Sequence, residues 1–73
     1  NAICPGFIEG EWLQKGMGTE MYEAVKSRVQ STTPLKKTCT PESIAEVILN
    51  LIETSELMTG QLVTVDGGAS LNL

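Results

Sequence analysis

The sequence predicts an α/β fold in which a strand, two helices and a second strand follow one another along the chain. Short runs of apolar and β-branched residues, at 1–4 and 61–66, are typical of strands. Two stretches with helical periodicity lie between them, at about 19–29 and 41–53. Strands and helices in this order predict a parallel sheet that is covered by helices.

The first predicted strand ends at Pro5-Gly6, a pair typical of turns because proline fixes φ and glycine adopts conformations that other residues avoid. The next segment, residues 7–18, combines three glycines with large apolar side chains, namely Phe7, Ile8, Trp12, Leu13 and Met17. This composition predicts a mobile flap that covers a site. The same side chains could instead fill the core, and the sequence leaves both interpretations open.

The first predicted helix is expected to be capped by Thr19 and to continue to about Val29. Met21, Val25 and Val29 recur every four residues, which places them on one face of that helix. A loop that contains Pro34 follows, because proline disfavours the helical conformation in the residue before it.

The second predicted helix has the clearest signals. Thr40 suits the N-cap, Pro41 suits the first helical position, and Glu42 complements the positive end of the helix dipole. Apolar residues then recur at helical spacing, at Ile44, Val47, Ile48, Leu51 and Ile52. This stripe predicts that the helix covers one face of a sheet.

The second predicted strand, Gln61 to Asp66, is bounded by glycines on both sides. Two strands do not form a stable sheet in water. A chain of 73 residues also buries only about 60% of its unfolded surface. Since the sequence moreover begins at Asn1 and not at a methionine, we expect it to be part of a larger domain that supplies the remaining strands.

The charge of the chain disfavours some classes of partner. Nine acidic and five basic residues give a net charge of −4, whereas nucleic acids and anionic membranes attract basic surfaces. No stretch approaches the roughly 18 consecutive apolar residues of a membrane-spanning helix. No charged leader followed by an apolar run, as in a signal peptide, is present. We therefore expect no nucleic acid and no membrane among the partners.

The chain has two cysteines, Cys4 and Cys39, and no histidine. Two cysteines are too few for a disulfide framework and lack the spacing of a metal site, so we expect no metal. Both are expected to be reduced and unpaired, as is typical of a cytoplasmic protein.

Four segments carry a resemblance to a known family: Asn1–Gly6, Pro34-Leu35, Thr40–Ala45 and Thr59–Gly68. In this order and at this spacing, they resemble the C-terminal part of the short-chain dehydrogenases/reductases, a family that includes ketoreductases and alcohol dehydrogenases. The resemblance implies the C-terminal portion of a doubly wound, Rossmann-like nucleotide-binding fold with a parallel sheet. Residues 1–73 would then belong to a single NAD(P)-binding domain whose N-terminal part is absent. It also implies an oxidoreductase that uses NAD or NADP to interconvert a carbonyl and an alcohol by hydride transfer.

The resemblance further implies which residues face the cofactor. Pro5 and Gly6 would shape the wall beside the nicotinamide, and the backbone of Ile8 would form hydrogen bonds with its carboxamide. The alternative is that Pro5-Gly6 is an ordinary turn. The family often has a threonine at the position of Gly10, and its hydroxyl contacts the cofactor. Here a backbone group or a water molecule would replace that hydroxyl, or Thr19 would approach instead.

Tyr22 and Lys26 have the Tyr-x-x-x-Lys spacing of the family's catalytic pair, in which the tyrosine acts as general acid or base. In the family that pair precedes the Pro-Gly turn, whereas here it follows the turn. We therefore expect an ordinary pair on the surface of a helix. The family's catalytic Ser, Tyr and Lys and its glycine-rich phosphate loop have no counterpart in this sequence, so we expect no catalytic residue in it.

The variable substrate flap of the family corresponds to the stretch that contains Trp12, Leu13 and Met17. These residues are expected to contact the small carbonyl or alcohol substrate, together with Met21 and Tyr22, unless they serve only to pack helices together. A mainly apolar wall would favour a lipophilic or ring-bearing carbonyl compound.

By analogy with the family, the last strand and the tail, residues 62–68 and 69–73, would pair subunits into a homodimer or homotetramer. The full-length protein would be an enzyme, and the chain alone is expected to be inactive because it lacks the catalytic residues. A second interpretation is that the full-length protein is a degenerate, non-catalytic member that acts as a binding or scaffolding subunit. Gly10 leans slightly toward that interpretation.

Overall fold

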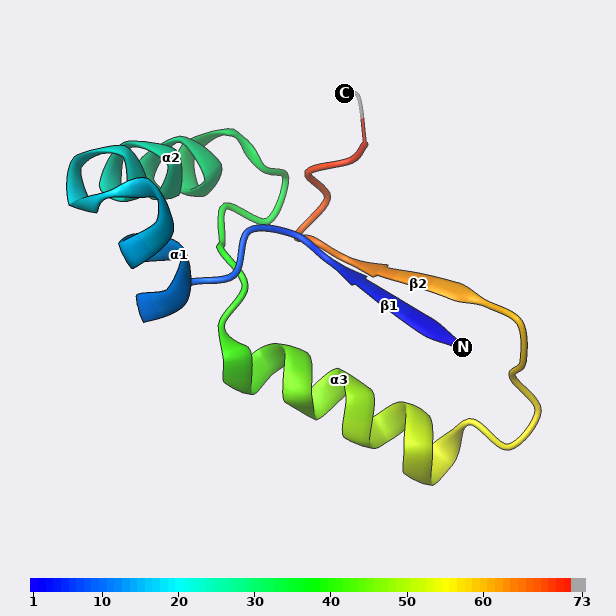
Figure 1. Cartoon of the computed structure of the whole chain (residues 1–73). Coiled ribbons are helices and arrows are strands. Elements are labelled where there is room, and N and C mark those ends of the chain that lie inside the picture. The colour runs from blue at the N-terminus through cyan, green and yellow to red at the C-terminus, as the bar shows by residue number, and fades with distance from the viewer. Residues whose placement is uncertain (72–73) are drawn as a thin grey trace.

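The structure is a computed structural model that describes residues 1–71 (Figure 1). It contains two strands and three helices, in the order β1 (Ala2–Pro5), α1 (Glu11–Met17), α2 (Thr19–Thr32), α3 (Pro41–Thr54) and β2 (Leu62–Val65). The predicted α/β order is thus present, with one helix, α1, added to the two that the sequence predicted.

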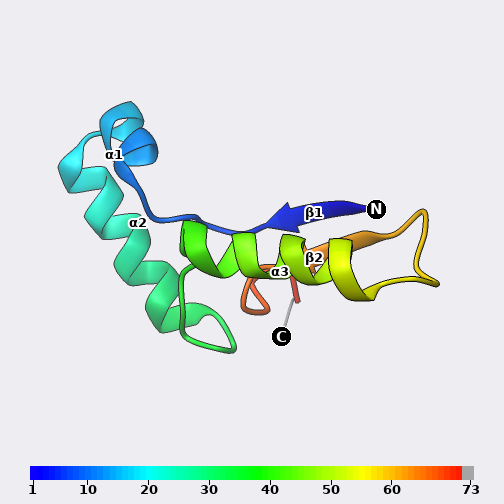
Figure 2. The same cartoon turned by 90° about the horizontal axis from the view of Figure 1, so that it is seen from below.

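The two strands pair in parallel, as predicted, with Ala2 opposite Leu62 and Pro5 opposite Val65. Parallel strands need a crossover connection, which α3 provides by running along the strands in the opposite direction (Figure 1). Seen from below, α3 overlaps the strands, so that it lies over one face of the sheet (Figure 2). The carboxyl ends of both strands therefore lie at the same end of the molecule.

The start of α3 confirms the predicted cap. The Thr40 hydroxyl accepts a hydrogen bond from the Ser43 N–H at 3.1 Å, and the Ser43 hydroxyl accepts one from the Thr40 N–H at 3.0 Å. This capping box pairs two N–H groups, and Pro41 occupies the first turn as expected.

The apolar stripe of α3 is only partly covered: Val47 and Leu51 are half-buried, and full burial is reached only near the N-terminal end of the helix. Ile44 is buried, whereas Ile48 and Ile52 are 42% and 76% exposed. The sheet has only two strands of four residues each, whereas α3 spans 14 residues. So small a sheet cannot bury the whole apolar face of the helix.

The prediction of a loop through residues 7–18 was wrong, because α1 forms within it. Gly10 and Gly18 flank this helix, and the residues between them are mostly good helix formers. Gly18 has φ 84°, in the region that favours glycine, and it separates α1 from α2. Thr19 is therefore the first residue of α2 and not its cap.

Helix α2 also runs further than predicted, to Thr32 in place of Val29. The hydroxyls of Ser31 and Thr32 both donate to the Arg28 carbonyl, at 3.0 and 2.7 Å, and so satisfy a carbonyl near the end of the helix. None of the helices within residues 1–71 is long and apolar enough to cross a membrane. Figure 1 shows α1 and α2 as a pair set to one side of the sheet, connected to it by two extended segments.

Candidate functional site

The candidate site is built around residues 6–10, which leave the carboxyl end of β1 and are called the post-turn segment below. The segment runs beside Cys39, whose N–H donates to the Phe7 carbonyl at 2.8 Å and whose carbonyl accepts from the Glu9 N–H at 2.9 Å. These bonds form a parallel bridge between Ile8 and Cys39. The post-turn segment therefore extends β1 toward the paired helices and is held on one side by Cys39.

Cys39 itself is tied to the sheet. Its buried thiol donates to the Val65 carbonyl at 3.3 Å, at the end of β2. Cys4 is exposed, and both cysteines are free thiols in this structure. The buried thiol thus connects the post-turn segment to the second strand as a structural group.

Gly6 marks a close approach between the two strand ends. Its N–H donates to the Val65 carbonyl at 3.1 Å. A Cβ atom at this position would lie 2.8 Å from the Asp66 Cβ and 3.0 Å from the Asp66 Cα, closer than carbon atoms tolerate. Glycine is therefore required sterically here, which gives the Pro5-Gly6 pair a structural role in addition to any contact with a ligand.

Ile8 presents free backbone groups on the side opposite Cys39. In an extended segment successive residues direct their N–H and carbonyl groups to opposite sides. The Phe7 carbonyl and the Glu9 N–H point toward Cys39, so the N–H and carbonyl of Ile8 point away from it. Within residues 1–71, neither the N–H nor the carbonyl of Ile8 forms a hydrogen bond. An N–H and a carbonyl that are adjacent and unpaired form a ready site for a ligand with one acceptor and one donor.

Tyr22 is buried, and the expectation that it lies on the surface of a helix was wrong. Only 5% of the residue is exposed, and its ring packs against Phe7 with the ring centroids 5.6 Å apart. Its hydroxyl accepts a hydrogen bond from the Gly10 N–H at 3.1 Å. Tyr22 therefore holds the post-turn segment against α2 through Phe7 and Gly10.

Lys26 holds the same segment one helical turn further along α2. Its Nζ lies 2.8 Å from Glu9 Oε1, and the Thr38 hydroxyl donates to the other carboxylate oxygen of Glu9. The ammonium hydrogen bond, followed by that of Thr38, lowers the pKa of Glu9 below its ordinary value, and the Glu9 carboxylate raises the pKa of Lys26. Both groups are therefore charged at neutral pH.

The ion pair predicts a pH dependence of stability. Because the pKa of Glu9 is lower in the folded protein, its contribution is present above the ordinary value of 4.5 and is lost as the pH falls through the folded value. The pKa of Lys26 is raised, so its contribution is present below 10.5 and is lost as the pH rises through the folded value. We expect Glu9→Gln to destabilise the protein between these limits and to have no effect in more acid solution.

Urea denaturation of the wild type and of Glu9→Gln over a series of pH values measures this difference. Glu46→Gln is the matched control, because Glu46 is exposed on α3 and forms no ion pair within residues 1–71. A difference between wild type and Glu9→Gln that persists unchanged in strong acid would contradict the assignment.

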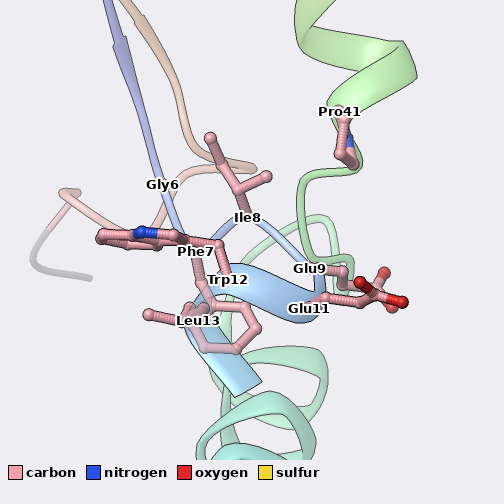
Figure 3. Close-up of a pocket in the computed structure, with 9 residues that line it drawn as sticks. Gly6, Phe7, Ile8, Glu9, Glu11, Trp12, Leu13 and Pro41 are labelled. Atoms are coloured by element: carbon pink, nitrogen blue, oxygen red, sulfur yellow. The ribbon is translucent and has the colours of Figure 1, made fainter. Parts of the chain in front are cut away.

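A hollow of about 530 Å³ lies beside the post-turn segment. Its lining consists of residues 6–13 and Pro41. Figure 3 shows the side chains of Trp12 and Leu13 on one side of this hollow and the carboxylates of Glu9 and Glu11 on the other. The hollow therefore has an apolar wall formed by α1 and an acidic edge.

The structure brings together most of the residues that the sequence predicted for this site. Gly6, Ile8, Trp12 and Leu13 line the hollow, and Trp12 is 86% exposed beside it. Pro5 is the last residue of β1 and precedes the lining.

Met17 lies instead in a second hollow of about 570 Å³ that shares Trp12 and Leu13 with the first. Met21 is exposed on α2, whereas Tyr22, considered with it for substrate contact, is buried. The stretch expected to contact substrate is therefore divided between two adjoining hollows and a buried ring.

Gly10 stands where the family often has a threonine whose hydroxyl contacts the cofactor, and its surroundings bear on which group could replace that hydroxyl. Its N–H is bound to Tyr22, and its carbonyl accepts from the Gln14 N–H at 3.1 Å, so both of its backbone groups are already paired. Thr19 is exposed, lines a different hollow with Glu11 and Gln14, and does not line the one beside Ile8.

Sequence reasoning did not identify Glu9, Thr38 and Cys39 as parts of the site. The contacts of Thr38 and Cys39 with the post-turn segment join residues 29 to 32 positions apart, for which no local periodicity exists. The one available signal was the helical spacing of Tyr22 and Lys26, which places both side chains on one face of α2.

Comparison with known proteins agrees with this architecture. The model of the family described as enoyl-(acyl carrier protein) reductase matches residues 1–70. A protein named as a ketoacyl reductase of the granaticin polyketide synthase of Streptomyces violaceoruber is 41% identical over 71 residues, which are 97% of this chain and 27% of that protein. A 3-oxoacyl-(acyl-carrier-protein) reductase of Thermotoga maritima is 38% identical over 69 residues, 93% of this chain and 26% of that protein.

A crystal structure of a small-chain dehydrogenase in complex with NADPH matches 93% of this chain and 30% of its own, with a TM-score of 0.81 and 40% identity. The likeness confirms the predicted fold class, a portion of a doubly wound, Rossmann-like α/β fold. The chain spans about a quarter of the length of the curated relatives it matches. With the family model covering nearly all of its residues, the chain belongs to the short-chain dehydrogenase/reductase family.

Proposed function

We propose that residues 1–73 form the C-terminal part of a single NAD(P)-binding domain, in an oxidoreductase that interconverts a carbonyl and an alcohol. The observation that carries this proposal is the free backbone of Ile8 beside an apolar hollow, at the carboxyl ends of two parallel strands. Ligands of doubly wound folds bind at that end of the sheet. The family and the small-chain dehydrogenase that binds NADPH support the same assignment.

The residues present fit a nicotinamide ring. Its carboxamide has one carbonyl acceptor and one NH₂ donor, which match the unpaired N–H and carbonyl of Ile8. Gly6 allows the chain to pass close to Asp66 and brings Ile8 to the hollow, and Pro5 would form the wall behind the ring. When bound, the cofactor supplies or accepts the hydride. The contribution of this chain is to orient the ring and to exclude water from it.

The apolar wall of the hollow supports a lipophilic or ring-bearing carbonyl substrate. Trp12 and Leu13 offer large apolar surfaces, and Met17 extends them into the adjoining hollow. The exposed carboxylate of Glu11 at the opposite edge would repel an anionic substrate. We infer that neutral ketones are better substrates than keto acids.

The test is an assay of the full-length protein encoded by the reading frame that contains this chain. We expect oxidation of NADH or NADPH, followed by its absorbance, with cyclic and aliphatic ketones and little with keto acids. The 73-residue chain is expected to be inactive in the same assay, because the family's catalytic Ser, Tyr and Lys have no counterpart in it and Tyr22 and Lys26 are engaged with the post-turn segment. Turnover by the purified chain alone would contradict the prediction that the catalytic residues lie outside residues 1–73.

The alternative is a non-catalytic member that acts as a binding or scaffolding subunit. Gly10, which offers no hydroxyl where the family often has one, favours it. A full-length protein that binds NAD(P)H but reduces no ketone would support this alternative, as would an upstream sequence without the Tyr-x-x-x-Lys pair.

We also infer a cytoplasmic homodimer or homotetramer that is joined through β2 and the tail. Leu62, the first residue of β2, and Leu71, in the tail, are 75% and 59% exposed, and such apolar surface favours a partner. Residues 72 and 73, the end of the predicted tail, lie outside the described residues. Sedimentation of the full-length protein would determine its oligomeric state, and a monomer would contradict this inference.

A further inference from the structure

Two side chains of α2 hold two consecutive residues of the post-turn segment. The Tyr22 hydroxyl accepts from the Gly10 N–H, and Lys26 forms its ion pair with Glu9. One contact is made to the backbone and the other to a side chain, so each can be removed by its own substitution. Both lie directly after Ile8, whose free N–H and carbonyl define the cofactor contact.

We propose that Tyr22 and Lys26 are positioning residues, which fix the backbone of Ile8 for the nicotinamide end of the cofactor. This inference rests on the proposed function. It assigns a role to the Tyr-x-x-x-Lys spacing of this helix that differs from the acid–base chemistry of the family's pair. Neither side chain touches the cofactor in this role, because each acts through Glu9 or Gly10.

The geometry excludes a role in proton transfer for Tyr22. Its ring is covered by Phe7, only 5% of the residue is exposed, and it does not line the hollow beside Ile8. Its hydroxyl oxygen is occupied by the Gly10 N–H. A general acid or base needs its proton within reach of the reacting group, which this burial prevents.

The segment is held on two sides. Cys39 pairs with Phe7 and Glu9 on one side, while Tyr22 and Lys26 fix its far end from α2. Thr38, the neighbour of Cys39, binds the same carboxylate as Lys26 and so joins the two sides. Loss of either α2 contact frees the far end of the segment and widens the range of orientations of the Ile8 peptide groups.

The experiment compares two ligands of the full-length protein, NAD(P)H and the matching ADP-ribose, which lacks the nicotinamide. For Tyr22→Phe, which keeps the ring but leaves the Gly10 N–H unpaired, we expect the Kd of NAD(P)H to rise about tenfold. For Lys26→Met, which breaks a partly exposed ion pair, we expect a rise of about threefold. The Kd of ADP-ribose should stay within about twofold of the wild-type value in both variants, because its contacts lie elsewhere on the domain.

Two further variants serve as controls. Lys26→Arg retains the charge and should restore wild-type affinity for NAD(P)H. Arg28→Met removes a cation from the same helix that has no ion pair within residues 1–71, and it should change neither affinity. If Tyr22→Phe does not fold, Lys26→Met tests the same segment independently.

The outcomes separate this inference from the proposed function. If the wild-type protein binds ADP-ribose as tightly as NAD(P)H, then Ile8 does not bind the nicotinamide and the proposed cofactor contact fails. If the wild type prefers NAD(P)H and the variants keep that preference, only the positioning role is overturned. Equal loss of both ligands would also overturn it, since that pattern reports general unfolding.

Discussion

Replacing Gly6 by alanine is expected to destabilise the protein by about 1–3 kcal/mol, because the added methyl group collides with Asp66, directly after β2. The Cβ atom would lie 2.8 Å from the Asp66 Cβ and 3.0 Å from its Cα, so that backbone must move. The movement also strains the hydrogen bond from the Gly6 N–H to the Val65 carbonyl. No rotation of a flexible side chain relieves this contact.

The same change is expected to impair the site, since Gly6 leads directly into Phe7 and Ile8. A displacement of about 1 Å at a positioning group costs as much as a hundredfold in rate, so we expect kcat/KM to fall by about that factor. Urea denaturation and steady-state kinetics of the full-length protein measure the two effects. Gly16→Ala is the control, because a methyl group there meets nothing within 4 Å and replaces a helical glycine. Since Gly16 also lines the second hollow, this variant is a control for stability alone, and it should raise stability by up to about 1 kcal/mol.

A variant Gly6→Ala with wild-type stability and activity would show that β1 and β2 separate freely at this end. The collision in the structure would then not constrain the protein. Loss of stability with normal kinetics would restrict Gly6 to a structural role and would weaken the proposed contact with the cofactor.

The elements with strong local signals were predictable from the sequence. Helix α3 begins where Thr40 and Pro41 place it, since a cap and its proline act within one turn. The two strands and their parallel pairing follow from β-branched runs separated by a helix of sufficient length. Each of these features depends on neighbours in the sequence, which is why a local pattern identifies it.

The features that depend on distant contacts were not predictable in this way. Tyr22 is buried because Phe7 and Gly10 lie over it, and these residues reach it only when α1 folds back against α2. Helix α1 itself was obscured by its flanking glycines, which end the helix and do not interrupt it. The sequence placed Tyr22 and Lys26 on one helical face but contained no signal for what lies against that face.

The turn after β2, which contains Gly68, is held by hydrogen bonds and contacts the loop that leads to the site. The carboxylate of Asp66 accepts hydrogen bonds from the N–H groups of Gly68 and Ser70, at 2.9 and 2.8 Å. Hydrogen bonds from the hydroxyl and the N–H of Ser70, and then from the N–H of Gly68, lower the pKa of Asp66. The Gly67 carbonyl accepts from the Leu35 N–H at 3.0 Å, which ties the turn to the loop that leads to Cys39.

Replacing Gly68 by alanine is expected to destabilise the protein by about 2–4 kcal/mol, for two reasons that add. Gly68 has φ 93°, a conformation that side chains with a Cβ rarely adopt. The Cβ atom would also lie 2.7 Å from the Pro34 Cγ. Because Pro34 lies in the loop that positions Thr38 and Cys39, we expect the affinity for NAD(P)H to fall as well.

The two causes are separable by adding Pro34→Ala, which removes the Cγ that the new methyl group meets. If the collision dominates, Gly68→Ala should cost much less stability in the Pro34→Ala background than it costs in the wild type. If the backbone conformation dominates, the loss is the same with or without Pro34, because strain at φ 93° does not depend on the proline ring. Urea denaturation of the four proteins gives this coupling, and unchanged stability in Gly68→Ala would contradict both causes. The thermodynamic cycle therefore shows whether the backbone conformation of Gly68 or its close contact with Pro34 sets the need for glycine beside the loop that leads to Cys39.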